Sequence, residues 1–517
     1  MFSTIYSGAV CGLQAYLIRV EVDLAGGLPA FLMVGSLGSE VRESRERVCV
    51  AMKNSGFQIP PGHITVNLAP ADRRKDGTAF DLPIAIGLLQ DMELLKEDAV
   101  KDTLFLGELG LNGEIKKAKG VLPIVREATR RGIHRVIVPR ENALEAAVIP
   151  GVTVWGVGNL GELFTALVHP GEDEEKIYRP RVCPEDLLKC SGGDRRGDFR
   201  EVAGQESARR GALIAAAGFH NLLMMGPPGV GKSMIAGRIP GILPPLTLEE
   251  SIEVSKIYSI CGLLKPDTPL VLQRPFRSPH HSTTAQAMAG GGRNPKPGEI
   301  SLASYGTLFL DELTEFQPKI LDLLRQPMEE GSITVSRLNQ TVVFPAKTMI
   351  AAAMNPCKCG YYPDMQKCRC TAASIERYIN RISQPLLDRI DICVETPQIK
   401  FEELNGTKKE ECSDTIRERV IEVHAIQKKR YQKEDFQFNS QIPAARIAEY
   451  CALSKDQEKY MKKIYKQLNL TARSYHKILK VARTLADMDG SENILDAHLN
   501  EAVCYRNIDK RFWRDSL

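Results

Sequence analysis

The apolar residues near the start of the chain fall into short β-branched runs separated by helical patterns. HRVIVP at 134–139 and VTVWGV at 152–157 have the composition and length of strands. LPIVREATRRG at 122–132 repeats its apolar residues at helical spacing and ends in Gly132, which predicts a helix before the first of these strands. The pattern predicts an α+β domain over residues 1–170.

The periodicity disappears between residues 171 and 198, where charged residues, proline and glycine predominate, and we interpret this stretch as a linker. Strand–helix alternation returns over 199–398. NLLMMG, GTLFLDE and TMIAAAMN are apolar runs without polar alternation, as expected of parallel strands covered on both faces. Residues 399–517 predict helices alone, beginning with a charged amphipathic segment at 413–431. The expected fold is α/β with a helical C-terminal part.

Composition narrows the class of protein. A chain of 517 residues is long for one domain, and 43% hydrophobic and 26% charged residues are typical of a globular protein in water. No apolar run is long enough to span a membrane, and the first residues lack the basic segment of a signal peptide. We therefore expect a cytoplasmic protein without a membrane partner. The net charge of +4 gives no global indication of nucleic-acid binding.

The segment GPPGVGKSMIAG, which begins at residue 226, lies between an apolar run and a predicted helix. It fits the phosphate-binding pattern G-x-x-x-x-G-K-[ST]. In such a loop the glycines let backbone amides approach the phosphates, the lysine reaches the β/γ-oxygens, and the hydroxyl ligates Mg²⁺. We expect ATP and Mg²⁺ at this loop, held by Gly226, Pro227, Pro228, Gly229, Val230, Gly231, Lys232 and Ser233.

Polar residues end the next two apolar runs. TLFLDE places Asp311 and Glu312 at the end of a buried strand, where two carboxylates are costly unless they have a partner. Asp311 is expected to hold Mg²⁺ and Glu312 to orient the attacking water. TMIAAAMN ends in Asn355, which can position water against the γ-phosphate. A pair of helix-capping acids and an ordinary turn asparagine are the simpler alternatives.

The phosphate loop, the acid pair and the strand-end asparagine, in this order, resemble the AAA+ ATPases. LLDRIDI at 386–392 matches the segment in which that family carries an arginine finger, here Arg389, although Arg381 could share the role. LTARSYHKILKVARTLADM at 470–488 matches the helical lid, with Arg473 as the second sensor arginine. The resemblance implies an oligomer, most often a hexamer, because the finger acts on a neighbouring subunit. A surface ion pair is the alternative for either arginine.

Longer segments are similar to the ComM/YifB proteins, in the magnesium-chelatase-like branch of AAA+. They include FREVAGQESARRGALIAAAGFHNLLMMGPPGVGKS, RPFRSPHHSTTAQAMAGGGRNPKPGEISLASYGTLFLDEL and the region from MNPCKCG to DRIDICVE. The resemblance implies a hexameric DNA motor that promotes branch migration during transformation, and so DNA as the partner. The pair His280 and His281 has no nearby thiol or carboxylate in the sequence; contacts to DNA or a neighbouring subunit are favoured over a metal.

EEGSITVSRLNQTVVFPAKT at 329–348 predicts a hairpin around a Leu-Asn-Gln turn, between the acid pair and Asn355. In the MCM-like branch the corresponding hairpin enters the ring channel and carries a basic residue, and Arg337 stands there. One arginine per subunit would give repeated phosphate contacts. A plain hairpin with a solvated arginine is the alternative.

Four of the 13 cysteines follow Asn355 closely, in the pattern C-x-C-x₈-C-x-C. Thiolates at this density suit tetrahedral zinc, although each pair is one residue shorter than the usual knuckle spacing. Reduced thiols without metal are the alternative, and a disulfide is disfavoured in the cytosol. The candidate zinc ligands are Cys357, Cys359, Cys368 and Cys370.

Residues 74–89 and 107–142 resemble the proteolytic domain of Lon, which has a ribosomal S5 domain 2-like fold. The position matching its serine nucleophile is Ala79, beside Thr78, and the position matching its lysine is Leu122. A Ser–Lys dyad needs both partners, so we expect a Lon-like domain without peptidase activity. A Lon-type protease and a magnesium-chelatase-like chaperone for a protein and a porphyrin remain the alternatives to a DNA motor.

Overall fold

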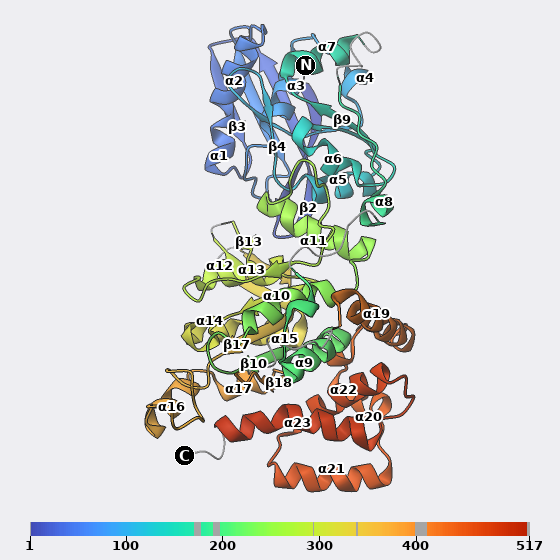
Figure 1. Ribbon diagram of the computed structural model, residues 1–517. Helices are drawn as coiled ribbons and strands as arrows, with labels where there is room; N and C mark the ends of the chain where they lie inside the picture. The colour runs from blue at the N-terminus through green and yellow to red at the C-terminus, as the bar shows by residue number, and fades with distance from the viewer. Residues whose placement is uncertain are drawn as a thin grey trace. The chain divides into compact units, whose positions relative to one another are not determined.

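The first apolar stretch forms an antiparallel pair of strands, β1 (Phe2–Cys11) and β2 (Gln14–Ala25), in the computed structural model (Figure 1). The structure describes residues 2–169, 177–189, 197–292, 294–337, 340–398 and 411–513. They divide into two units. Unit 1 comprises Met1–Ser191, Thr247–Leu272 and Gly291–Pro297, and unit 2 comprises Gly192–Leu246, Gln273–Gly290 and Gly298–Leu517.

Unit 1 is built on one seven-stranded sheet of order β3-β4-β2-β1-β5-β8-β9. Its other strands are β3 (Ala30–Val34), β4 (His63–Ala69), β5 (Thr103–Phe105), β8 (Arg135–Pro139) and β9 (Thr153–Val157). The strands β8 and β9 confirm those predicted from the two β-branched runs. Because successive side chains point to opposite faces, one strand contributes to two cores: Ile5 of β1 packs in one and Tyr6 packs against the other.

Helices cover both faces of this sheet. The core on one face includes side chains of α2 (Ser44–Asn54), α3 (Asp81–Asp91) and α7 (Leu160–Val168). The core on the other includes α5 (Val121–Arg130) and α6 (Ala143–Ala147). Helix α5 confirms the predicted helix, and its apolar positions are fully buried. Unit 1 is therefore a sheet between two helical layers.

Helix α11 (Leu248–Cys261) follows the phosphate-loop helix in sequence, yet it belongs to unit 1. Its N-terminus is closed by a capping box between Thr247 and Glu250. Arg126 of α5 pairs with Glu253 at 3.1 Å, and the hydroxyl of Ser259 donates to a buried carboxylate of α6, Glu145. These contacts join segments more than 100 residues apart, which no local pattern in the sequence indicated.

Unit 2 contains a five-stranded sheet in which every pairing is parallel. Its order is β11-β14-β17-β10-β18, formed by β10 (Leu222–Met225), β11 (Phe276–Arg277), β14 (Thr307–Leu310), β17 (Met349–Met354) and β18 (Ile392–Glu395). Every residue of β10, β14 and β17 is buried, which confirms the parallel strands predicted from the three apolar runs. Their carboxyl ends meet at one edge, where ligands bind in open α/β sheets.

The described residues beyond β18 are helical, as predicted. The main helices are α19 (Ser413–Arg430), α21 (Lys455–Gln467), α22 (Ala472–Met488) and α23 (Asp496–Trp513). Apolar residues of α19 and α22 share one core with strands β10, β17 and β18 and helices α9 (Glu206–Gly218) and α10 (Lys232–Ile242). Among the described residues no helix has both the length and the apolarity to cross a bilayer.

The predicted hairpin is confirmed as β15 (Ser332–Arg337) paired antiparallel with β16 (Gln340–Pro345). Gln340 was expected in the turn but belongs to the strand, where it pairs with Arg337, because the ladder extends further than the turn residues suggested. Residues 338–339 lie outside the described part, as does the side chain of Arg337. The hairpin adjoins α15 (Arg325–Glu330), whose Gln326 side chain accepts from the Thr334 amide at 3.1 Å and donates to its hydroxyl at 3.0 Å.

The remaining elements are short. Within the stretch interpreted as a linker, α8 (Pro184–Lys189) forms and Tyr178 pairs with Gly156, whereas 170–176 and 190–196 lie outside the described residues. The other short elements are α1 (Ser39–Arg42), α4 (Glu97–Val100), β6 (Glu108–Leu109), β7 (Ile115–Lys116), α12 (Ala285–Ala289), β12 (Gly290–Gly291), β13 (Lys296–Pro297), α13 (Glu299–Leu302), α14 (Pro318–Leu323), α16 (Ala372–Ile379), α17 (Gln384–Leu387) and α20 (Ile447–Tyr450).

Candidate nucleotide site

The segment 226–231 connects β10 to α10 at the carboxyl edge of the sheet. Gly229 and Gly231 have φ of +78° and +90°, and a Cβ at either position would meet no atom within 4 Å, so the space beside these two glycines is open. Gly226 is confined instead, because a Cβ there would collide with the carbonyl oxygen of Thr396. An open loop at the N-terminus of an 11-residue helix suits a phosphate group.

Lys232 is the first residue of α10, and its side chain is buried in the loop. Its ammonium donates to the carbonyls of Gly226 at 2.6 Å and Pro227 at 2.8 Å, and to Oδ1 of Asn355 at 3.1 Å. Burial lowers the pKa of Lys232 to about 8, against a smaller raising effect of the Asp311 carboxylate. The fold thus joins the predicted lysine and the strand-end asparagine at one point.

The hydroxyl of Ser233 donates to Oδ2 of Asp311 at 2.6 Å. A serine hydroxyl and a carboxylate at the mouth of a phosphate loop are the oxygen donors that Mg²⁺ takes beside a triphosphate. The residues present therefore fit a nucleoside triphosphate with Mg²⁺. The other Asp311 oxygen accepts from the backbone of Glu312 at 2.9 Å, which fixes the orientation of the carboxylate.

Glu312 has a left-handed backbone, with φ of +51°, which is uncommon for a residue with a side chain. Such conformations are concentrated at functional sites. Its carboxylate lies 3.5 Å from Nδ1 of His281, whose ring packs 4.0 Å from the ring of His280. The sequence left contacts of the histidine pair to DNA or to a neighbouring subunit open. In the structure, one of the two histidines lies directly beside the acid pair.

Arg389 and Arg473 come from segments far apart in sequence, and both pair with Oε1 of Glu329, at 3.0 and 2.6 Å. Glu329 lies on α15, directly before the hairpin, and no motif in the sequence indicated its role. Arg381, the alternative finger, pairs instead with Glu315 at 3.2 Å. The two predicted arginines are therefore brought together at one carboxylate.

A buried ion pair holds the Arg389 segment to α22. Lys477 pairs with Asp391 at 2.5 Å and also donates to the Arg389 carbonyl at 3.2 Å. Burial alone would raise the pKa of Asp391, but the ammonium of Lys477 and the neighbouring His220 outweigh it and keep that pKa below its ordinary value. The carboxylate stays charged at neutral pH, which favours this ion pair. Breaking such a pair by removing one partner is costly.

The four cysteine sulfurs lie within 4.8 Å of one another. Three of their separations, between 3.3 and 3.8 Å, approach the roughly 3.8 Å that tetrahedral bonds of about 2.3 Å to zinc would give. The donor set and its spacing therefore fit a zinc ion. A Cβ on Gly360, inside this loop, would lie 2.5 Å from Cδ of Pro228, so the cysteine loop packs directly against the phosphate loop.

The two positions of unit 1 that the sequence matched to a Ser–Lys dyad, Ala79 and Leu122, hold neither a serine nor a lysine. Leu122 is fully buried in α5, and its amide donates to Glu145 at 3.0 Å. Thr78, beside the partly buried Ala79, donates its hydroxyl to the carboxylate of Glu108. A hydroxyl that donates to a carboxylate could in principle be activated, but the lysine of a Ser–Lys dyad is replaced by a core leucine.

Three family models match successive parts of the chain. Residues 20–142 match subunit ChlI of Mg-chelatase, residues 198–404 match magnesium chelatase subunit ChlI, and residues 410–506 match its C-terminal part. Competence protein ComM of Haemophilus influenzae is 40% identical over 506 residues, which cover 97% of each chain. The chain belongs to the ComM/YifB family of magnesium-chelatase-like proteins.

Other relatives agree with this membership. Uncharacterized protein YifB of Salmonella typhimurium is 41% identical over 509 residues, 98% of this chain and 97% of its own. The magnesium-chelatase 38 kDa subunit of Rhodobacter capsulatus is 26% identical over only 175 residues, 31% of this chain and 50% of its own. The family implies an ATPase.

Proposed function

We propose that this chain is an ATPase that assembles into a hexameric ring and uses ATP hydrolysis to move single-stranded or branched DNA. The observation that carries the proposal is the convergence of Lys232, Ser233, Asp311 and Asn355 at one edge of the sheet. Similarity along nearly the whole chain to a protein named for competence supports a role with DNA. The proposed setting is recombination or transformation, in the cytoplasm.

The roles proposed at the site follow from its contacts. The phosphate loop binds the triphosphate, with Lys232 turning its ammonium from the loop carbonyls to the β/γ-oxygens. Ser233 and Asp311 hold Mg²⁺, which neutralises phosphate charge when bound. Glu312 orients and polarises the attacking water, and Asn355 positions it. His281, at 3.5 Å, keeps the Glu312 carboxylate at the mouth of the site.

Arg389 and Arg473 are proposed to act on the triphosphate of the neighbouring subunit. They share one carboxylate, and α22 is clamped to the Arg389 segment through Lys477, so the pair can be presented as one rigid surface. In this proposal the C-terminal helices form the lid. A guanidinium that meets charge only in the transition state contributes about 10³–10⁵ in rate.

The hairpin β15–β16 is the proposed DNA contact, through Arg337. It follows the helix that carries Glu329, and Gln326 fixes its first strand to that helix. Movement of the arginine pair would therefore be transmitted to the hairpin. Unit 1 is proposed to be Lon-like without peptidase activity, because the position matched to the lysine of the dyad holds the buried Leu122.

The cysteine loop is proposed to hold one zinc ion as a structural clip. Residues 355–371 contain no helix or strand, so a metal would supply the rigidity that secondary structure does not. Since Gly360 touches Pro228, a closed cysteine loop would support the outer side of the phosphate loop. The contact with Pro228 favours a role for this loop at the nucleotide site.

A three-strand branch-migration assay with ATP tests the main proposal. The wild-type protein should resolve the substrate, with ATPase stimulated by single-stranded DNA. Lys232→Ala should lose nucleotide binding, whereas Glu312→Gln should bind ATP and hydrolyse it slowly. The same preparation incubated with casein tests the protease alternative. No DNA binding at low salt, or equal hydrolysis by Glu312→Gln and wild type, would overturn the proposal.

Metal analysis of protein purified without added zinc tests the clip. We expect about one equivalent of zinc per chain, and Cys368→Ser should abolish both the zinc content and the ATP affinity. Cys504→Ser is the matched control, because Cys504 is exposed on α23 and outside the cluster. A zinc content below half an equivalent that does not change in Cys368→Ser would contradict the assignment.

A further inference from the structure

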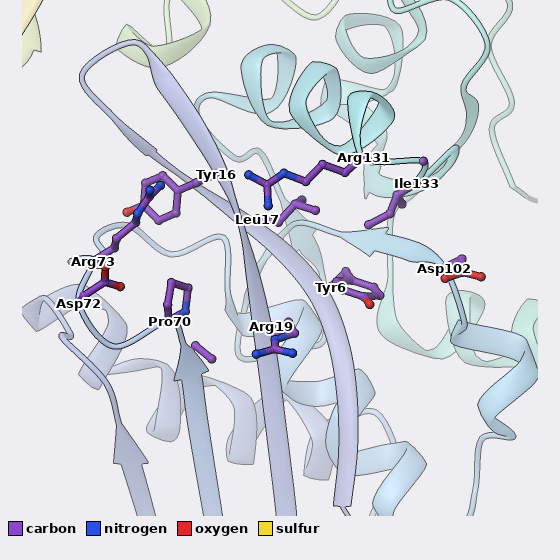
Figure 2. Close-up of a pocket in the computed structure, with 12 residues that line it drawn as sticks. Tyr6, Tyr16, Leu17, Arg19, Pro70, Asp72, Arg73, Asp102, Arg131 and Ile133 are labelled. Atoms are coloured by element: carbon purple, nitrogen blue, oxygen red, sulfur yellow. The ribbon is translucent and has the colours of Figure 1, made fainter.

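A groove of about 580 Å³ lies on unit 1, away from the phosphate loop in sequence (Figure 2). Its floor comes from β1 and β2, one wall from the loop after β4, and the other from the residues before β5 and after α5. Every lining residue belongs to unit 1. They are Tyr6, Tyr16, Leu17, Arg19, Ala69, Pro70, Asp72, Arg73, Asp102, Arg131, Gly132 and Ile133.

The floor combines an aromatic ring with a guanidinium. Tyr6 of β1 and Arg19 of β2 are direct cross-strand partners, so both side chains point to the same face of the sheet. Tyr6 is half-buried and Leu17 lies beside it on that face, whereas Arg19 is 61% exposed. Arg131, at the end of α5, is 56% exposed and in Figure 2 reaches toward Leu17.

The wall formed by the loop after β4 is held in place from behind. The hydroxyl of Tyr16 donates to the Arg74 carbonyl at 2.6 Å, and the buried ammonium of Lys75 donates to the Pro70 carbonyl. Burial raises the pKa of Tyr16 to about 12, so its hydroxyl remains a donor at neutral pH. Arg73 then lies 4.9 Å from the centroid of the Tyr16 ring. These contacts, all made within unit 1, fix the shape of this wall of the groove.

Three guanidiniums surround an aromatic and aliphatic floor. Arginine suits phosphate oxygens, and an exposed ring face stacks on any base. Two carboxylates, Asp72 and Asp102, also line the groove; they oppose a bare anion but can accept hydrogen bonds from base amino groups. A nucleic acid presents a flat base beside every phosphate, whereas an acidic peptide pairs the two only where an aromatic residue happens to lie beside its carboxylates, so this mixture favours nucleic acid.

We propose that this groove binds single-stranded nucleic acid, with a base against Tyr6 and the adjacent phosphates against Arg19, Arg73 and Arg131. The inference rests on the proposed function, because it assumes that DNA is the substrate. It adds a second contact, on unit 1, to the hairpin of unit 2. The strand would then touch each subunit at two places.

Binding of a fluorescent thymidine oligonucleotide to the full chain without nucleotide tests this inference. The combined variant Arg19→Ala, Arg73→Ala, Arg131→Ala should weaken affinity at least tenfold, and should flatten the salt slope by about 0.7 for each phosphate that is no longer bound. Arg45→Ala is the matched control, since Arg45 is 52% exposed on α2 of the same unit and outside the groove. Thymidine monophosphate as competitor distinguishes a strand from a free nucleotide.

Photo-crosslinking from iodouracil in the same oligonucleotide identifies the contact directly. The crosslinked peptide should contain Tyr6, and Tyr6→Leu, which keeps the apolar packing, should abolish it. If the triple variant keeps the affinity and the salt slope of the wild type, the groove does not bind the strand. The same follows if the crosslink forms only outside the groove. Either result would leave the proposed DNA motor intact. If thymidine monophosphate competes at the same concentration as the oligonucleotide, the groove binds a free nucleotide and the proposal of a strand site is wrong. Failure of the wild type to bind any oligonucleotide would overturn the proposed function itself.

Discussion

Lys232 is held by three oxygens, two of them backbone carbonyls. In the proposed function this ammonium turns from the carbonyls to the β/γ-oxygens of the triphosphate. Its burial also weakens its charge, because desolvation disfavours the ammonium and brings the pKa down to about 8. The residue most important for phosphate binding is therefore sensitive to pH within the range used in assays.

ATP affinity is expected to fall as the pH rises from 7 to 9. Above a pKa of about 8 a growing fraction of Lys232 is neutral in the free protein and no longer attracts the phosphates. Titration of a fluorescent ATP analogue across this range measures the effect. Lys232→Arg, which keeps its charge over the whole range, should bind less well but with a flat profile. A flat profile in the wild type would contradict the assignment.

Gly226→Ala is expected to destabilise the protein and weaken ATP binding. The new methyl would collide with the Thr396 carbonyl oxygen, and both are backbone-anchored, so the end of β10 must shift. Overpacking of this kind costs about 1–3 kcal/mol. Thermal unfolding with and without ATP measures both effects. Gly237→Ala in α10 is the control, because its Cβ meets open space and should stabilise the helix by about 0.5–1 kcal/mol.

At the scale of elements, α15 connects the arginine pair with the hairpin. Glu329 binds both arginines, and three residues earlier Gln326 binds the first strand of the hairpin. Both contacts are made by the same helix of six residues. We therefore expect the arginines and the proposed DNA contact to be mechanically coupled over a short distance.

Glu329→Gln is expected to raise the ATPase rate without DNA several-fold and to reduce the stimulation by DNA. The substitution keeps the shape of the side chain but removes the charge that restrains both guanidiniums. Partly exposed pairs contribute about 0–1 kcal/mol each, so a several-fold change is the appropriate scale. Steady-state ATPase with and without single-stranded DNA measures it.

Glu330→Gln is the control for this prediction, because Glu330 accepts from Gln326 at 2.8 Å instead of holding an arginine. It should leave the basal rate unchanged. A fall of the basal rate in Glu329→Gln would show that the carboxylate aims the arginines rather than restraining them.

At the scale of the whole molecule, the chain does not divide into consecutive domains. The stretch Thr247–Leu272 leaves unit 2 and packs in unit 1 through α11. Each unit is therefore completed by segments separated in sequence. Truncation at residue 198 would remove α11 from unit 1, and with it Glu253, the ion-pair partner of Arg126.

Mixing two inactive variants should restore ATPase activity if the arginines act between subunits. Lys232→Ala removes the subunit's own site, and Arg389→Ala removes only what it gives to its neighbour. At equal amounts, roughly a quarter of the head-to-tail interfaces combine an intact site with an intact finger. ATPase of the mixture against each variant alone measures this. A separate measurement must first show that the two variants exchange subunits. If they exchange and the ATPase activity still does not recover, Arg389 acts on the triphosphate of its own subunit. Arg381→Ala in the same mixture serves as the comparison.

The sequence alone determined those features that local patterns encode. The phosphate loop, the buried parallel strands, the hairpin and the C-terminal helices follow from spacing and from apolar runs, because burial and backbone geometry act over a few residues. The cysteine spacing likewise indicated a cluster. Family membership followed from the same motifs, since their residues stand in a fixed order along the chain.

The tertiary structure decided which distant residues meet. Glu329 joins Arg389 and Arg473, Gly360 lies against Pro228, and α11 crosses to unit 1. None of these contacts can be predicted from the spacing of residues along the chain, because each depends on how separate elements pack against one another. The groove on unit 1 is of the same kind: its arginines are scattered from residue 19 to 131, and only the sheet brings them to one surface.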